Sequence, residues 1–384
     1  MPPPKDIPKL ISLTQTTQTL LAHFQTSLAP PTNKASTSSS NEAPDLPNGP
    51  LTAIHAATTL LKSHTTTLSL LLLTPPFTPS ALIAKIGDVT SGALSGMVAA
   101  ASHAPSAGSR DDLGQIMRGE MREAVKRVVA AWSGVLRQVL AMAEARRELA
   151  GKDAGPSEAE RRDVLAATGM VWDVCDRVLR LCDGGVVELV LKKAQQLRAV
   201  LLDAVEEMKE WGEDVASDSE EEEDKAEGSG GEDDGFGDED DFFGANNKIG
   251  KGDVELKVLL DRSVKKLKMV AIMYQAVGKR RLNTFPAVRG SNPASAVAMD
   301  GGDGIDTPAQ RLDKLMHILK TIPESVDDLA STFYELEQEE AEVALKKVCD
   351  EAKSAVQMME KSWTGTDDEF TAWAAKWTQA LDLV

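Results

Sequence analysis

The stretch that decides the fold is residues 125–142, VKRVVAAWSGVLRQVLAM. Its large apolar residues recur every three or four positions: Val125, Val128, Trp132, Val135, Val139 and Met142. This spacing places the side chains on one helix face, as in the seam of an antiparallel helical bundle. Residues 186–215 repeat the pattern with Val190, Ala194, Leu197, Leu201, Ala204, Met208 and Trp211. Two such seams predict long, packed helices.

Composition supports an all-helical chain. Hydrophobic residues make up 42% of the sequence but aromatic residues only 4%, so the apolar mass is mostly aliphatic. That balance favours helices over a β-sandwich, and neither hairpin turns nor a βαβ rhythm is visible. A length of 384 residues favours two domains. We therefore predict an all-α fold of two antiparallel helical bundles joined by a disordered acidic linker.

Breaks in composition give the expected domain boundaries. Stretches rich in Pro, Ser, Asn and Gly cannot offset their ordering entropy by burial and are expected to be disordered. The expected order is an N-terminal helix packed on the first bundle (1–29), a disordered loop (30–50), the N-terminal bundle (51–216), the acidic linker (217–252) and the C-terminal bundle (253–384), which contains a disordered loop (286–306).

Residues 217–244, SDSEEEEDKAEGSGGEDDGFGDEDDFFG, carry fourteen acidic side chains and one lysine. They account for most of the net charge of −18. Ser217 and Ser219 each precede an acidic residue by three positions, the pattern that acid-directed kinases favour, so we predict phosphorylation there. The segment also holds a candidate docking motif, Phe236, Phe242 and Phe243, although a solvated linker with incidental phenylalanines remains the alternative.

A basic cluster lies in the second bundle. Lys279, Arg280 and Arg281 form a candidate nuclear-import patch or a surface for acidic partners. A solvated helix face and an intramolecular contact with the acidic run are the alternatives. Direct binding of nucleic acid is not expected, because the cluster has no interleaved aromatic residues and the chain is acidic overall.

The sequence predicts neither catalysis nor a cofactor. Its five histidines are scattered without metal-ligand spacing, and the glycines near residue 230 follow no strand and lie among acids. Cys175, Cys182 and Cys349 are expected to be buried thiols in a reducing compartment. The N-terminus lacks the apolar core of a signal peptide, and the run LSLLLL (68–73) is too short to span a bilayer. We expect a protein of the nucleus and cytoplasm that is not bound to a membrane.

Two aromatic features are expected to be structural. Trp172, within MVWDVCD, is predicted to be a core residue. Phe370, Trp373 and Trp377 share a helical face near Trp363, which indicates either a bundle cap or an exposed anchor for a partner. The helices around them are expected at 308–321, 323–361 and 366–382.

Three strings resemble a known family: LLKSHTTTLSLLLLTPPFTPSALIAKIGDVTSGALSGMVAAA (60–101), TGMVWDVCDRV (168–178) and KMVAIMYQAVGKRRL (268–282). With the layout around them, they look like the cyclin-D-binding proteins, which are Grap- and cyclin-D-interacting regulators of the helix-loop-helix and leucine-zipper type. The resemblance implies a non-enzymatic protein, nuclear and cytoplasmic, that contacts cyclin-type partners. The chain has no basic region of the kind that reads DNA.

The leading hypothesis is therefore a protein-interaction factor that regulates the cell cycle or transcription by binding cyclin-type or other helical partners. A vinculin- or catenin-like scaffold of the cytoskeleton or adhesion sites is the first alternative, because such proteins also use tandem helical bundles. An acidic histone-binding chaperone is the second, and it rests on residues 217–241 alone. The oligomeric state stays open.

Overall fold

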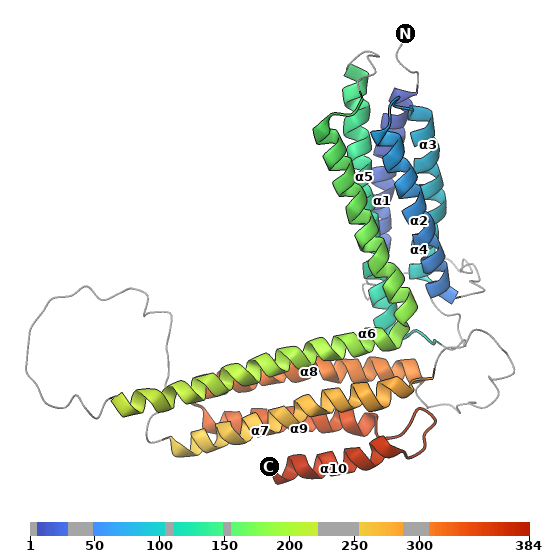
Figure 1. The fold of residues 1–384 in the computed structure, drawn as a ribbon. Coiled ribbons are helices and arrows are strands. Elements are labelled where there is room, and N and C mark those ends of the chain that lie inside the picture. Colours follow the sequence, from blue (N-terminus) through green and yellow to red (C-terminus); the bar gives the residue numbers. More distant parts are fainter. Residues whose placement is uncertain (1–5, 30–48, 104–110, 149–154, 222–252, 287–306) are drawn as a thin grey trace, which may run out of the picture. The chain divides into compact units, whose positions relative to one another are not determined.

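The computed structural model describes residues 6–29, 49–103, 111–148, 155–221, 253–286 and 307–384, without the side chains of 214–221 (Figure 1). Over these ranges the chain is helical and contains no strand, so the all-α prediction is confirmed. The remaining segments, which include most of the expected loops and of the acidic linker, lie outside the described residues.

The chain divides into two compact units between Leu189 and Val190, and not at the acidic segment as the sequence suggested. The cause lies inside α6 (Glu158–Glu221), where Gly185 has φ 62° and ψ −164°. Glycine adopts this conformation without a steric penalty, so the helical path breaks there, directly before the predicted seam of residues 186–215. The part of α6 from Val190 onward belongs to the second unit. Its helix also continues through residues 217–221, the first part of the expected linker.

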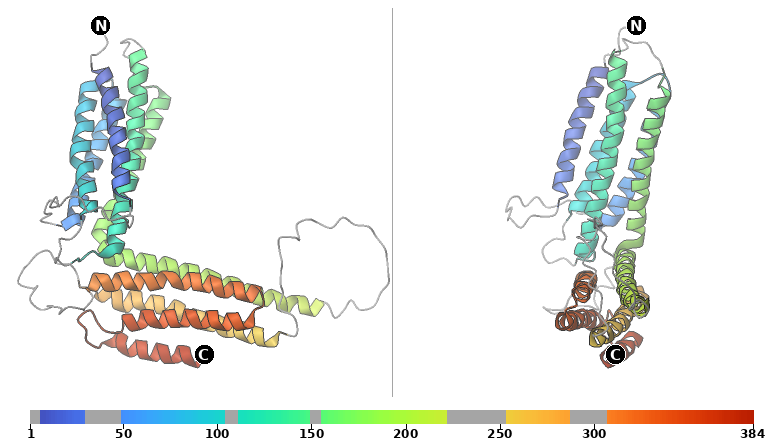
Figure 2. Two further views of the ribbon diagram at one scale, coloured as in Figure 1. Left: turned by 180° about the vertical axis from the view of Figure 1, so that it is seen from behind. Right: turned by 90° about the vertical axis from the view of Figure 1, so that its left-hand side faces the viewer.

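The first unit is built from helices that lie side by side (Figures 1 and 2). They are α1 (Ile7–Ser27), α2 (Gly49–Leu73), α3 (Pro79–Asp88), the π-helical turn η1 (Val89–Leu94), α4 (Ser95–Ser102), α5 (Gly114–Glu148) and the first part of α6. Helix α1 packs on α5 and α3, while α2 packs on α3, η1 and α4. The predicted seam of α5 is confirmed, because Val125, Val128, Trp132 and Val139 are fully buried.

Buried hydroxyl groups run through the core of the first unit. Thr14, Thr58, Thr65 and Thr168 each donate to the main-chain carbonyl one turn earlier, at 2.7–2.8 Å. These bonds satisfy the hydroxyls within their own helices, and the Thr58 hydroxyl also lies 4.0 Å from the sulfur of Met97 on α4. Among the described helices, only α5 is long and apolar enough to span a membrane, and 44% of its apolar stretch is buried inside the protein. The core helix of a protein in water can have the same length and apolar character.

The second unit begins with the rest of α6 and continues through helices that also run alongside one another (Figure 2). They are α7 (Val254–Ala276), the π-helical turn η3 (Val277–Arg281), the 3₁₀ turn η4 (Leu282–Thr284), α8 (Pro308–Tyr334), α9 (Gln338–Met358) and α10 (Glu369–Leu383). Helix α9 packs on α7, α8 and α10. On α6, Val190, Ala194, Leu201 and Met208 are buried as predicted, whereas Leu197 is half-buried.

The predicted break at Pro323 is wrong. Pro323 is buried inside α8, which continues to Tyr334, and the chain turns at Leu336, whose φ is 62°. Proline removes a backbone donor and disfavours the helix interior. Here the apolar face that α8 packs on α9, which includes Ile322, Val326 and Phe333, offsets that cost.

Candidate interaction surfaces

A groove runs between α5 and α6 in the first unit. Its floor is made of small side chains: Ala130, Ala131 and Gly134 from α5, and Ala166 and Ala167 from α6. Val174, Met170, Gln138, Asp163, Arg127 and Arg137 complete the lining, which is mostly apolar. Because the floor residues have little or no side chain, another helix could approach the two backbones closely.

The two arginines of the groove differ in their contacts. Arg127 lies 3.7 Å from the carboxylate of Glu120. Arg137 is exposed, and a Cβ atom added at Gly134 would lie 3.7 Å from its Nη2. No described residue pairs with the guanidinium of Arg137. The unpaired guanidinium of Arg137 therefore lies close to Gly134, the residue of the groove that has no side chain.

Apolar side chains are exposed on α6 at and beyond the rim of the groove. Met170 is 62% exposed, and Trp172 is 39% exposed. The prediction that Trp172 is a core residue is therefore wrong. The buried stripe of α6 runs through Val164, Thr168, Val171, Cys175 and Val178. Trp172 follows Val171 and so points about 100° away from that stripe.

Polar contacts hold α6 against the rest of the first unit without closing the groove. Lys62 of α2 donates to Asp176 at 2.5 Å. At the start of α6, the backbone N–H of Ser157 donates to the Glu160 carboxylate and the backbone N–H of Glu160 donates to the Ser157 hydroxyl, which forms a capping box. Burial raises the pKa of Glu160, but the bonds from Ser157 and from Arg146 outweigh burial and lower it. The carboxylate is therefore ionised and fixes the first turn of α6.

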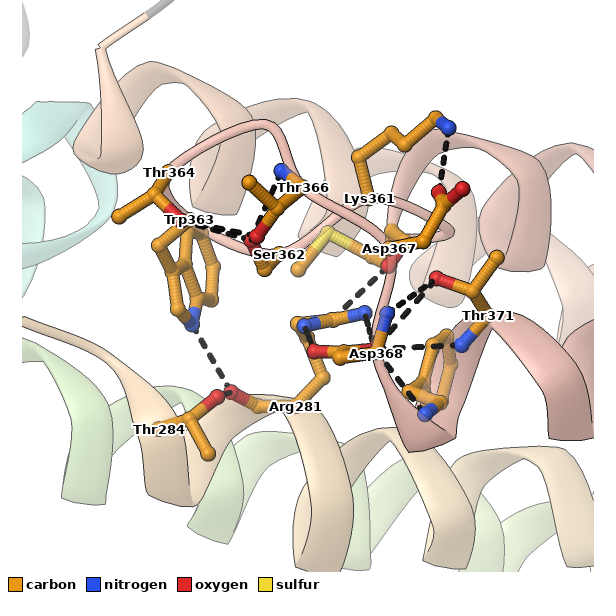
Figure 3. Close-up of polar contacts among 12 residues, drawn as sticks. Arg281, Thr284, Lys361, Ser362, Trp363, Thr364, Thr366, Asp367, Asp368 and Thr371 are labelled. Carbon is orange, nitrogen blue, oxygen red and sulfur yellow. Dashed lines mark hydrogen bonds and ion pairs between the residues drawn. The ribbon is translucent and has the colours of Figure 1, made fainter.

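In the second unit, Arg281 is fully buried at the end of η3 (Figure 3). Its guanidinium donates to the carbonyl oxygens of Met359 and Glu360, at 2.8 and 2.9 Å, and to both carboxylate oxygens of Asp368, at 2.6 and 3.0 Å. The ring of Phe370 lies 4.7 Å from its carbon Cζ. This placement removes Arg281 from the predicted exposed patch, because all of its polar groups point into the protein.

Asp368 joins this network to the start of α10. Its carboxylate accepts hydrogen bonds from the backbone N–H groups of Phe370 and Thr371, at 3.0 and 3.2 Å. The hydrogen bond from Arg281 is the main cause that lowers the pKa of Asp368, and burial opposes it. One carboxylate thus caps α10 and neutralises a buried arginine.

The C-terminal aromatic residues form a cap, which was one of the two predicted interpretations. Phe370 and Trp377 are buried, and the indole N–H of Trp377 donates to the carbonyl of Met269 at 3.0 Å. Trp363 donates in the same way to the carbonyl of Arg281, at 3.0 Å. Trp373 is half-buried and stacks on Trp377, with 6.0 Å between ring centroids. The aromatic face is therefore committed to the unit itself.

The other predicted site residues have different fates. Lys279 and Arg280 are exposed, and Arg280 lies over the ring of Trp373 at 6.0 Å. Ser217 and Ser219 fall in the last turns of α6, where side chains are not described. The candidate docking motif of Phe236, Phe242 and Phe243 lies outside the described residues. None of the predicted site residues that the structure describes lines the groove between α5 and α6.

No group of three or more His, Cys, Asp or Glu side chains within the described ranges could hold a metal ion. The thiols of Cys175 and Cys349 are buried, and that of Cys182 is half-buried. Burial raises the pKa of Cys175 and of Cys182 to about 12 and also raises that of Cys349. The neutral thiols are weak nucleophiles.

These features define a helical-bundle protein whose accessible chemistry lies on helix faces. Residues 53–214 match the family model described as "Grap2 and cyclin-D-interacting, N-terminal". The resemblance seen in the sequence is therefore confirmed, and the matched span contains the groove between α5 and α6.

The chain is also similar to an uncharacterized protein of Schizosaccharomyces pombe. The two are 22% identical over 349 residues, which cover 88% of this chain and 86% of the yeast protein. No solved structure matches the chain.

Proposed function

We propose that the protein is a non-enzymatic interaction factor that regulates cell-cycle progression or transcription by binding cyclin-type or other helical partners. The observation that carries this proposal is the family match over residues 53–214, whose description names interaction with cyclin D. The groove between α5 and α6 lies within that span and is the docking surface we assign to the partner.

The chemistry of the groove suits a helix. A partner helix with small or apolar residues on one face can enter between α5 and α6, since Ala130, Gly134 and Ala167 leave room for its backbone. Met170, exposed at the rim, has a flexible thioether side chain that adapts to different apolar surfaces. Arg137 favours an acidic residue on the flank of the partner helix.

The test is a binding titration of the full chain with a purified D-type cyclin. Met170→Glu places a charge on the apolar rim and is expected to weaken binding by at least about tenfold, which corresponds to about 1.4 kcal/mol. Leu70→Glu on α2 is the matched control, since Leu70 is 58% exposed and Met170 is 62% exposed. A wild-type chain that does not bind the cyclin contradicts the cyclin-type partner, and equal affinities of the two variants contradict the groove.

We further propose that the protein acts in both nucleus and cytoplasm, without direct contact to nucleic acid or a membrane, and is phosphorylated at Ser217 and Ser219. The net charge of −18 supports the absence of contact with nucleic acid or a membrane, because it repels phosphate backbones and anionic lipid headgroups alike. Cell fractionation and phosphosite mapping test the two parts separately. Absence of the protein from nuclei contradicts the first, and unmodified Ser217 and Ser219 contradict the second.

A further inference from the structure

The exposed side of α7 and η3 carries a narrow ridge. From residue 263 onward the exposed positions recur every three or four residues: Lys265, Lys268, Ile272, Gln275 and Lys279. Ile272 is 50% exposed, although its apolar neighbours Ala271 and Met273 are buried. Val254, Val258 and Asp261 continue the same face toward the start of α7. The ridge therefore combines cationic side chains with exposed apolar ones.

The lysines of this ridge are unpaired. No described residue forms an ion pair or a hydrogen bond with the ammonium groups of Lys265, Lys268 or Lys279. In contrast, Lys266 on the adjacent face donates to the carbonyl of Leu381 at 2.8 Å, and Arg262 lies 3.6 Å from Glu342. Three free cations around an exposed isoleucine fit a ligand that is acidic and carries bulky apolar side chains.

We propose that this ridge binds the chain's own acidic segment, residues 222–252. The segment contains eleven acidic residues and three lysines, so its charge is opposite to that of the ridge. Its three phenylalanines each lie within two residues of an acid, in DDGFGD (233–238) and DEDDFF (238–243). An aromatic side chain can cover Ile272 while the flanking carboxylates pair with the lysines.

The chain length permits this contact. The segment directly precedes α7, and the ten residues between Phe243 and Val254 can span about 33 Å when extended. Lys265 lies eleven residues beyond Val254, which is about 17 Å along the helix. From there to Lys279 the ridge runs about 21 Å further, and residues 232–243 are long enough to follow it.

The tether also favours the chain's own segment over a second copy. A connection of about ten residues holds a ligand at an effective concentration of about 1 mM, far above the micromolar concentration of a second chain in solution. A contact with a dissociation constant of about 0.5 mM is then about two-thirds occupied within one chain and nearly empty between chains. The inference goes beyond the proposed function and does not depend on the groove.

Zero-length carbodiimide cross-linking of the full-length protein, followed by mass spectrometry, tests the inference. Chains labelled with ¹⁴N and ¹⁵N are mixed so that links within and between chains are distinguished. Lys320 on α8 and Lys346 on α9 are internal controls, because both are exposed and neither has a partner among the described residues. We expect Lys265, Lys268 and Lys279 to link to acids of 232–241 within one chain, far more often than the controls do.

A variant with the eleven acids of 222–252 changed to Asn or Gln provides a second readout. Acylation of Lys265, Lys268 and Lys279 by a small succinimidyl ester is expected to rise about threefold, as a two-thirds occupied site becomes free, while Lys320 and Lys346 stay unchanged. Unchanged acylation overturns the inference, as does cross-linking at the level of the controls. Links that form only between differently labelled chains also overturn it and assign the ridge to a second copy.

Discussion

The groove of the first unit and the C-terminal end of the second use arginine in opposite ways. Arg137 is exposed over Gly134 and has no partner among the described residues. Arg281 is fully buried and donates to two carbonyls and one carboxylate. The guanidinium of Arg137 is available to a partner, whereas the hydrogen-bond donors of Arg281 are satisfied within the second unit. The difference lies in whether the structure already supplies acceptors.

The largest expected effect follows from the removal of the buried Arg281. Arg281→Met removes the guanidinium that donates to two carbonyls and to the Asp368 carboxylate, so we expect a loss of about 3–5 kcal/mol in the stability of the second unit. The exposed neighbour is the control, and Arg280→Met should change stability by less than about 0.5 kcal/mol. Urea unfolding followed by tryptophan fluorescence measures both. Similar midpoints for the two variants would break the comparison.

The next effect isolates the carboxylate. Asp368→Asn keeps the shape but leaves a buried guanidinium without its counter-charge, and we expect a loss of about 1.5–3 kcal/mol at pH 7. Because the folded pKa of Asp368 is lowered, its contribution is fully present above the ordinary pKa of about 4 and is lost as the pH falls through the lowered value. The wild-type chain should therefore lose more stability below pH 4 than the Asn variant. Parallel pH profiles would contradict this role.

A smaller effect should be the same in both units. Ser157 caps α6 in the first unit and Thr307 caps α8 in the second, each in a capping box. Ser157→Ala and Thr307→Ala should each cost about 1 kcal/mol in the thermal unfolding of their own unit. Since this contact is local, a cost several times larger in one unit would show that the units differ in more than their arginines.

The smallest effect is expected at the groove. Met170→Glu places a charge on a side chain that is 62% exposed, so stability should change by no more than about 0.5 kcal/mol. A buried counterpart on the same helix sharpens the contrast, because Val171→Glu puts an unpaired charge into the core and should destabilise the first unit far more than Met170→Glu. Circular dichroism melting measures both. A large loss for Met170→Glu would mean that the groove is packed in solution.

The sequence predicted the helices well where one apolar stripe dominates. The seam from Val125 to Met142 is buried, and the break before Val186 falls at Gly185. The prediction failed for Trp172, because apolar residues at consecutive positions in MVWDVC cannot share one face, and the size of a side chain does not decide which of them is buried. It failed at Pro323, because the packing of α8 on α9 outweighs a local helix preference.

The candidate sites were harder to predict. Arg281 stands in a basic run that is typical of a solvated face, and its partners Met359 and Asp368 lie 78 and 87 residues away. The groove exists because Ala130, Gly134 and Ala167 have no large side chains, and such residues add nothing to the hydrophobic periodicity from which helix faces are predicted. The apolar pattern of the sequence identifies the core. The acceptors of Arg281, distant in sequence, and the groove between α5 and α6 arise only when the chain is folded.

The most direct test of the central claim is the dissociation constant of the full chain for a purified D-type cyclin, with Met170→Glu beside Leu70→Glu. We predict that Met170→Glu weakens binding by at least about tenfold and that Leu70→Glu leaves it within about twofold of the wild type. Equal affinities for all three proteins would contradict the assignment of the groove between α5 and α6 as the docking surface.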